Sequence, residues 1–143
     1  MSDFRALSEK VLASPQISLA DIGLAKDQGV TLIINNRPDG EDASAPQSAD
    51  VAGAAESAGL SYLAIPISHS GFSQVQVDEM STALENAQGK VLAYCRSGTR
   101  STLLWALAQA KGGAPPDTIA HAAAAAGYDV TPVRPMLDML SSS

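Results

Sequence analysis

The chain has 143 residues, 45% of them hydrophobic and 17% charged, which is the size and composition of one folded domain. Its net charge of −6 argues against binding to a nucleic-acid backbone, and no apolar run reaches the roughly 18–20 residues of a membrane span. With one cysteine and no signal-peptide pattern, we expect a cytoplasmic domain over residues 1–143, without an internal disulfide, metal or cofactor.

Short apolar runs alternate with stretches of helical spacing in the first half of the chain. A short strand is predicted at residues 11–14. A helix then begins at a capping box, with Ser18 as the N-cap and Asp21 three residues on, and it ends at Gly29. The β-branched run at residues 30–35 predicts a strand that is covered on both faces. The next predicted elements are a loop at 37–49 and a helix at 51–58.

The second half continues this alternation. Its predicted elements are a strand at 62–67, a loop at 68–73, a helix at 75–87, a strand at 90–94, and helices at 101–111, 115–127 and 131–140. Pro66 favours an edge position for its strand, because proline cannot donate a ladder hydrogen bond. Strand–helix–strand repetition predicts an α/β fold in which helices flank a mostly parallel sheet. Ligands bind at the carboxyl ends of such strands, where three loops are expected to meet: 37–42, 68–73 and 95–100.

The sharpest feature is a cysteine segment between the strand at 90–94 and the helix at 101–111, with the sequence Cys95-Arg96-Ser97-Gly98-Thr99-Arg100-Ser101. A cysteine between a strand and a helix N-terminus lies where backbone amides and the helix dipole stabilise negative charge. The thiolate is the reactive form of cysteine. We therefore predict that Cys95 is a nucleophile whose sulfur faces solvent.

The other residues of this segment are predicted to bind an anionic substrate. Arg100 offers a two-pronged fork to an oxyanion. The amides of residues 96–99 can surround the same anion, and Gly98 allows a turn that a β-carbon would hinder. Ser101 is expected to donate a hydrogen bond to the sulfur. A cysteine that only fills space in the core is the alternative, and the two arginines beside the glycine argue against it.

The cysteine segment resembles the active-site loops of the dual-specificity phosphatases and of the rhodanese sulfurtransferases. Over residues 4–140 the chain more closely resembles the beta-lactamase-hydrolase-like protein, phosphatase-like domain family. The matching pieces are Gln16-Ile17-Ser18 with Asp21, the loop Asn35-Asn36-Arg37-Pro38-Asp39-Gly40-Glu41, and YCRSGTRSTLLWAL. The resemblance implies a dual-specificity-phosphatase-like fold. In some members this domain is fused to a persulfide dioxygenase and is described as a sulfurtransferase.

The length of the loop favours sulfur transfer. The phosphatases that it resembles carry five residues between the cysteine and the arginine, whereas four separate Cys95 from Arg100. A smaller ring suits a persulfide on Cys95 better than a phosphoryl group. We therefore predict a sulfurtransferase that forms a Cys95 persulfide, with a phosphatase that acts through phosphocysteine as the alternative. A non-catalytic anion-binding module is the third interpretation.

Phosphoester cleavage also benefits from an acid that protonates the leaving oxygen. His69 lies nearest the expected position, and three carboxylates lie on another loop at the same sheet edge: Asp39, Glu41 and Asp42. Sulfur transfer needs no such acid, since thiolate and sulfite leave or attack as anions. The expected partners are a small anionic substrate, either a sulfane-sulfur donor or a phosphoester, and for sulfur transfer a persulfide dioxygenase. Neither nucleic acid nor a membrane is expected.

Overall fold

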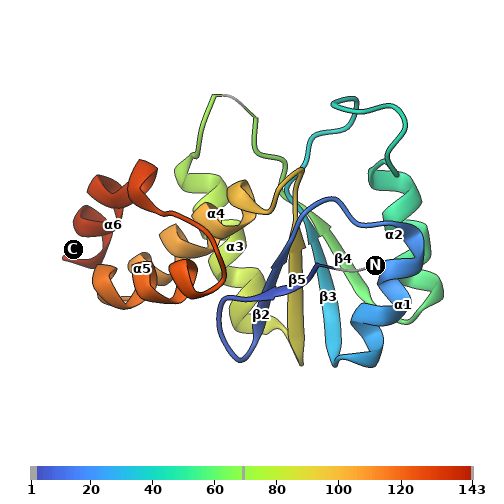
Figure 1. Ribbon diagram of the computed structural model, residues 1–143, viewed down its shortest axis with the longest axis horizontal. Coiled ribbons are helices and arrows are strands. Elements are labelled where there is room, and N and C mark those ends of the chain that lie inside the picture. Colours follow the sequence, from blue (N-terminus) through green and yellow to red (C-terminus); the bar gives the residue numbers. More distant parts are fainter. Residues whose placement is uncertain (1–2, 69, 143) are drawn as a thin grey trace.

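A central sheet organises the protein (Figure 1). The computed structural model describes residues 3–68 and 70–142, and within them the sheet has five strands. They are β1 (Arg5–Ala6), β2 (Val11–Ser14), β3 (Val30–Asn35), β4 (Ser61–Ala64) and β5 (Lys90–Tyr94). The strand order is β1-β2-β5-β3-β4, and every neighbouring pair except β1 and β2 is parallel. The prediction of a mostly parallel sheet is confirmed.

The strands that are buried on both faces are the ones that the sequence predicts best. β2, β3 and β5 begin and end at the predicted residues. β4 is shorter than predicted, because beyond Ala64 the carbonyl of Ile65 accepts from the side chain of Asn36 (2.9 Å) and Pro66 has no amide hydrogen. Its place at the edge of the sheet agrees with the expectation drawn from Pro66. β1 was not predicted, since two residues carry too little pattern.

Helices cover both faces of the sheet (Figure 1). One face carries α1 (Leu19–Asp27) and α2 (Ser48–Ser57), and the other carries α3 (Gln74–Asn86) and α4 (Thr99–Lys111). Two further helices pack against α4 on its outer side, α5 (Pro116–Ala125) and α6 (Arg134–Ser141). Within the described ranges, none of the helices is long and apolar enough to cross a membrane.

The central strand β5 contributes to a hydrophobic core on each side of the sheet. Successive side chains of a strand point to opposite faces. Accordingly, Val91 and Ala93 join the core under α3 and α4, whereas Leu92 and Tyr94 join the core under α1 and α2. The residue that follows Tyr94 is Cys95, so the cysteine directly follows the central strand of the sheet.

Two helix boundaries differ from the sequence prediction near the expected site. α2 begins at Ser48 rather than residue 51, because the carboxylate of Asp39 accepts the Ser48 amide (2.8 Å). α4 begins at Thr99 rather than Ser101, which places Arg100 in its first turn. At the other end of the chain, the predicted helix 131–140 is a 3-10 turn, η1 (Thr131–Val133), followed by α6.

Candidate active site

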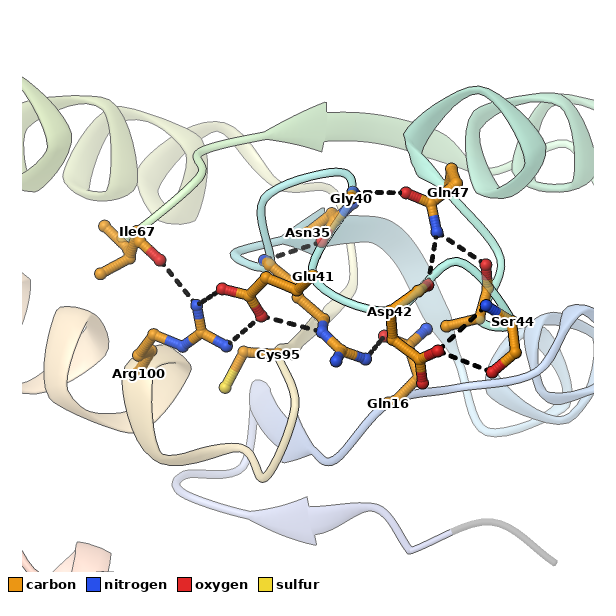
Figure 2. Close-up of polar contacts among 12 residues, drawn as sticks. Gln16, Asn35, Gly40, Glu41, Asp42, Ser44, Gln47, Ile67, Cys95 and Arg100 are labelled. Atoms are coloured by element: carbon orange, nitrogen blue, oxygen red, sulfur yellow. Dashed lines mark hydrogen bonds and ion pairs between the residues drawn. The ribbon is translucent and has the colours of Figure 1, made fainter. Parts of the chain in front are cut away.

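Three loops meet at the carboxyl edge of the sheet, following β3, β4 and β5, as the strand order requires. Together they line an open pocket of about 380 Å³, formed by Arg37, Glu41, Ser68, Arg96, Ser97 and Arg100. Three of these six residues are arginines, and a concave, positively charged surface attracts anions. The pocket is therefore the candidate binding site, and Figure 2 shows Cys95 beside Arg100, one of its lining residues.

Cys95 lies at the inner end of this site. Its backbone amide continues the β5 ladder by donating to the Ser14 carbonyl (3.3 Å), and its side chain is fully buried. The Gly98 amide donates to the Cys95 Sγ atom (3.1 Å). The expectation that the sulfur faces solvent is wrong, because the Cys95 side chain has no exposed surface. The expected hydrogen bond from a loop amide to the sulfur is present.

The loop holds its carbonyl groups away from the sulfur. The Arg96 carbonyl accepts the amide of Gln16 (3.1 Å). The Ser97 carbonyl accepts a hydrogen bond from the hydroxyl of Tyr128 (3.1 Å). The Gly98 carbonyl accepts from the amide and the hydroxyl of Thr102 (3.0 and 2.9 Å). A trans peptide unit presents its carbonyl and its N–H on opposite sides. Fixing the Ser97 carbonyl outward therefore favours the inward Gly98 amide that donates to Cys95 Sγ, whereas the Thr99 amide donates to the Ser97 hydroxyl (3.3 Å).

The guanidinium of Arg100 is held by Glu41 and Ile67 at one end, and Cys95 lies beside it. Its two terminal nitrogens donate to the Glu41 carboxylate (2.8 and 2.9 Å), and Nη1 also donates to the Ile67 carbonyl (2.7 Å). These contacts use both N–H groups of Nη1 and one of Nη2, out of the five that a guanidinium carries. The remaining two, on Nε and Nη2, share one edge and form a side-on fork for an oxyanion.

Glu41 links the loop after β3 to Arg100 (Figure 2). Its carboxylate also accepts from Arg37 Nε (2.9 Å), and Arg37 in turn donates to the Gln16 side chain (3.0 Å). The hydrogen bond from Arg100, followed by that from Arg37, lowers the pKa of Glu41 from 4.5 to about 2. The hydrogen bond with Glu41 in turn raises the pKa of Arg100, and the nearby Cys95 adds to this shift. Glu41 is therefore ionised at neutral pH and holds the guanidinium groups of Arg37 and Arg100 in place.

Ser101 does not take the role that the sequence suggested. Its hydroxyl donates its hydrogen to Asn36 Oδ1 (2.7 Å), so that hydrogen is not available to the Cys95 sulfur. Both side chains are buried, and Asn36 also donates to the Ile65 carbonyl (2.9 Å). Ser101 thus connects the start of α4 to the loop after β3 through a buried hydrogen bond.

The remaining predicted binding residues lie at the rim. Arg96, Ser97 and Thr99 are exposed, and the Ser97 hydroxyl donates to the Thr99 hydroxyl (3.0 Å). Gly98 is buried and adopts a positive φ of 92°, in the left-handed region that favours glycine, as its predicted turn requires.

The carboxylates that were candidates for the acid are committed to other contacts. Asp39 holds the first turn of α2. Asp42 accepts from the hydroxyl and amide of Ser44, which lower its pKa, and Glu41 is ionised by its two arginines. The fourth candidate, His69, lies outside the described residues.

Asn36 and Tyr128 support the site but were not among the predicted site residues. Asn36 looked like part of a polar loop, and only its position directly after a buried strand could have suggested a buried amide. Tyr128 lies 31 residues from the carbonyl that it binds, and no spacing links the two. Among the described residues, no cluster of three or more His, Cys, Asp or Glu could hold a metal ion.

Comparison with known proteins shows to which family the chain is related. A relative from Agrobacterium fabrum, the beta-lactamase hydrolase-like protein, is 33% identical over 107 residues, which are 75% of this chain and 25% of that protein. The chain thus spans about a quarter of the length of this curated relative.

Solved structures agree with the predicted fold. A candidate phosphatase from Neisseria meningitidis Z2491 matches with a TM-score of 0.84 and 34% identity, over 96% of this chain and 98% of that one. Human DUSP28 shares the fold at 16% identity, with a TM-score of 0.69 over 98% of this chain and 93% of its own. The family model described as beta-lactamase hydrolase-like protein, phosphatase-like domain, matches residues 3–112. The cysteine loop and this fold agree with that match, and the chain belongs to this family.

Proposed function

We propose that the protein hydrolyses phosphomonoesters through a phosphocysteine intermediate, the alternative that the sequence left open. The observation that carries this proposal is the side-on edge of Arg100, which places an oxyanion fork next to Cys95 in a residue that lines a pocket of about 380 Å³. A pocket of that size accommodates the alcohol part of an ester. The match to a candidate phosphatase over nearly the whole chain adds support.

The reaction needs two displacements at phosphorus. In the first, the Cys95 sulfur attacks, an S–P bond forms, the P–O bond to the alcohol breaks, and the leaving oxygen takes up a proton. In the second, water attacks phosphorus and loses a proton, the S–P bond breaks, and inorganic phosphate leaves with the thiolate restored. The two side-on N–H groups of Arg100 and the inward Gly98 amide bind the non-bridging oxygens through both steps.

Substrate entry requires movement at the rim. Cys95 has no accessible surface, so a phosphoryl group reaches the sulfur only after a covering side chain moves aside. Arg100 is held by Glu41 and Ile67, so it stays fixed during this movement.

Hydrolysis of p-nitrophenyl phosphate by the purified protein tests this proposal. Replacement of the nucleophile in Cys95→Ser should reduce kcat by roughly a thousandfold or more, and Arg100→Ala by about a hundredfold. Arg134→Gln is the matched arginine control, because Arg134 pairs with Asp117 and Asp138 outside the site, and its activity should stay at the wild-type level. Hydrolysis that survives in Cys95→Ser would rule the mechanism out.

Sulfur transfer is the second candidate, and the four-residue spacing between Cys95 and Arg100 favours it. In that reaction Cys95 takes a sulfur atom from a donor, becomes a persulfide, and passes the sulfur to a thiol or sulfite. A persulfide dioxygenase would be its partner. The two reactions differ in the adduct that mass spectrometry detects on Cys95, a sulfur atom after thiosulfate treatment or a phosphoryl group after aryl phosphate treatment. Binding of phosphate with no Cys95-dependent rate on either substrate would indicate an anion-binding module.

A further inference from the structure

The segment after residue 112 reaches back to the cysteine loop through one side chain. Tyr128 follows α5 and lies beyond residues 3–112, which the family model matches. Its hydroxyl donates to the Ser97 carbonyl (3.1 Å). Burial raises the pKa of Tyr128, so the phenol keeps the hydrogen that it donates. A residue outside the matched domain therefore contacts the loop that carries the nucleophile.

The bond from Tyr128 acts on the peptide unit that contacts the sulfur. The Ser97 carbonyl and the Gly98 amide belong to the same trans peptide and point in opposite directions. The carbonyl end accepts from Tyr128 (3.1 Å), and the amide end donates to Cys95 Sγ (3.1 Å). Rotation of this peptide would turn a carbonyl oxygen toward the sulfur, where it would repel both a thiolate and an oxyanion.

Tyr128 is itself held in place. The Arg5 guanidinium lies 5.3 Å from the centre of its ring, and the Tyr128 backbone amide donates to the Ala123 carbonyl (2.9 Å). The hydroxyl also lies so close to Gly98 that a β-carbon there would overlap it. Glycine at position 98 is thus required by the tyrosine as well as by its positive φ.

We propose that Tyr128 is a positioning residue for catalysis, which fixes the Ser97–Gly98 peptide so that its amide faces the Cys95 sulfur and the anion bound there. The proposal rests on the proposed function in one respect, the use of Cys95 as nucleophile. The neighbouring carbonyls of Arg96 and Gly98 are held by backbone amides, whereas the contact at Ser97 depends on a side-chain hydroxyl that one substitution removes.

Tyr128→Phe tests the geometry directly, because it keeps the ring and removes the hydroxyl. We expect hydrogen exchange at the Gly98 amide, followed by NMR, to accelerate about fivefold or more, the effect of losing one hydrogen bond. The amides of Ile119 and Ala123 in α5 should keep their protection. Unchanged exchange at Gly98, or faster exchange that extends equally through α5, would contradict a positioning role.

The same variant tests the consequence for catalysis. Tyr128→Phe should weaken inorganic phosphate binding and raise KM for p-nitrophenyl phosphate, each by about fivefold. Arg134→Gln controls for loosening of the C-terminal helices and should bind phosphate like the wild type. Wild-type phosphate affinity in Tyr128→Phe would overturn the proposal. By contrast, a wild-type protein that binds phosphate but does not hydrolyse the ester would overturn only the proposed function.

A second substitution covers the case in which Tyr128→Phe fails to fold. Incorporation of 3-fluorotyrosine at position 128 keeps the ring and makes the phenol a stronger hydrogen-bond donor. Phosphate should then bind at least as tightly as in the wild type, with the Gly98 amide equally protected. Weaker binding together with a wild-type melting temperature would contradict the proposal.

Discussion

Glu41 shows how one carboxylate can sit in an anion site and still assist it. It occupies the outer end of the Arg100 guanidinium and not the edge beside Cys95. Its charge opposes a bound phosphate, while its geometry orients the fork that binds one. The bidentate pair with Glu41 restricts the Arg100 guanidinium to one plane. The repulsion between Glu41 and a bound phosphate is offset by Arg37 and Arg100, which neutralise the carboxylate. We therefore expect the orienting effect to dominate.

Glu41→Gln tests this balance. The amide group of glutamine would face an Arg100 nitrogen that needs an acceptor, so the fork should rotate and KM for p-nitrophenyl phosphate should rise about tenfold. Asp42→Asn is the control, because Asp42 lies on the same loop but bonds to Ser44, and its KM should stay near the wild-type value. A lower KM in Glu41→Gln would mean that the carboxylate acts chiefly as a competing anion.

The same ion pairs predict a pH dependence of stability. The pKa of Glu41 is lowered from 4.5 to about 2 by Arg100 and then Arg37, so its contribution is fully present above pH 4.5. That contribution should disappear as the pH falls from 4.5 to 2, where the folded protein takes up the proton. Urea unfolding of the wild type and of Glu41→Gln measures it. The stability difference should be constant above pH 5 and should shrink below it; a constant difference down to pH 2 would contradict the assignment.

Of the four candidate proton donors, the three carboxylates are engaged elsewhere, which leaves His69 as the candidate to test. Its neighbour Ser68 lines the pocket. His69→Ala should slow hydrolysis of phenyl phosphate by about a hundredfold but that of p-nitrophenyl phosphate far less, because p-nitrophenolate leaves without a proton. Equal effects on the two esters would exclude His69 as the acid.

Asn36 joins three elements at the carboxyl edge of the sheet. Its side chain bonds the chain after β4 through Ile65 and the start of α4 through Ser101, while its backbone amide donates to the Tyr94 carbonyl of β5 (2.8 Å). All three contacts are buried near the cysteine loop. Asn36 therefore holds together the elements from which the active-site loops extend.

Asn36→Ala should lower the free energy of unfolding by about 2–4 kcal/mol, because it leaves a buried hydroxyl and a buried carbonyl without partners. Asn86→Ala, at the exposed end of α3, is the control and should change stability by less than about 0.5 kcal/mol. Chemical denaturation gives both values. A loss no greater than that of the control would show that the buried contacts of Asn36 contribute little.

The sequence predicts elements whose signal is local. The apolar runs at β3 and β5 define doubly buried strands, and the capping box at Ser18 defines the start of α1, as the structure confirms. The cysteine loop is predicted for the same reason, since its strand, glycine and arginine are contiguous. The contacts that complete the site join distant segments, such as Glu41 with Arg100 and Tyr128 with Ser97, and hydrophobic periodicity does not specify which loops touch.

The protein as a whole consists of a sheet with helices on both faces and a C-terminal helical pair packed against α4 (Figure 1). Leu137 of α6 is fully buried in that contact, whereas Met139 on the same helix is 69% exposed. Because Tyr128 lies between α5 and α6, the docking of this pair also determines whether its hydroxyl reaches the cysteine loop.

Leu137→Ala should lower the free energy of unfolding by about 2–5 kcal/mol, the usual range for a large core side chain. Met139→Ala should stay within about 0.5 kcal/mol of the wild type, because it removes little buried surface. Denaturant unfolding compares the two. Equal losses would mean that α6 is not docked on α4 in solution.

Trp105 lies in the middle of α4, and it is the protein's single tryptophan. Its indole is buried among the residues of the core that α3, α4, α5 and α6 share, and its Nε1 has no hydrogen-bond partner among the described residues. The fluorescence of this ring will therefore be blue-shifted in the native protein and will move to longer wavelengths when water reaches it. The molecule thus carries an intrinsic optical probe on the helix that follows the cysteine loop, and unfolding can be followed without a label.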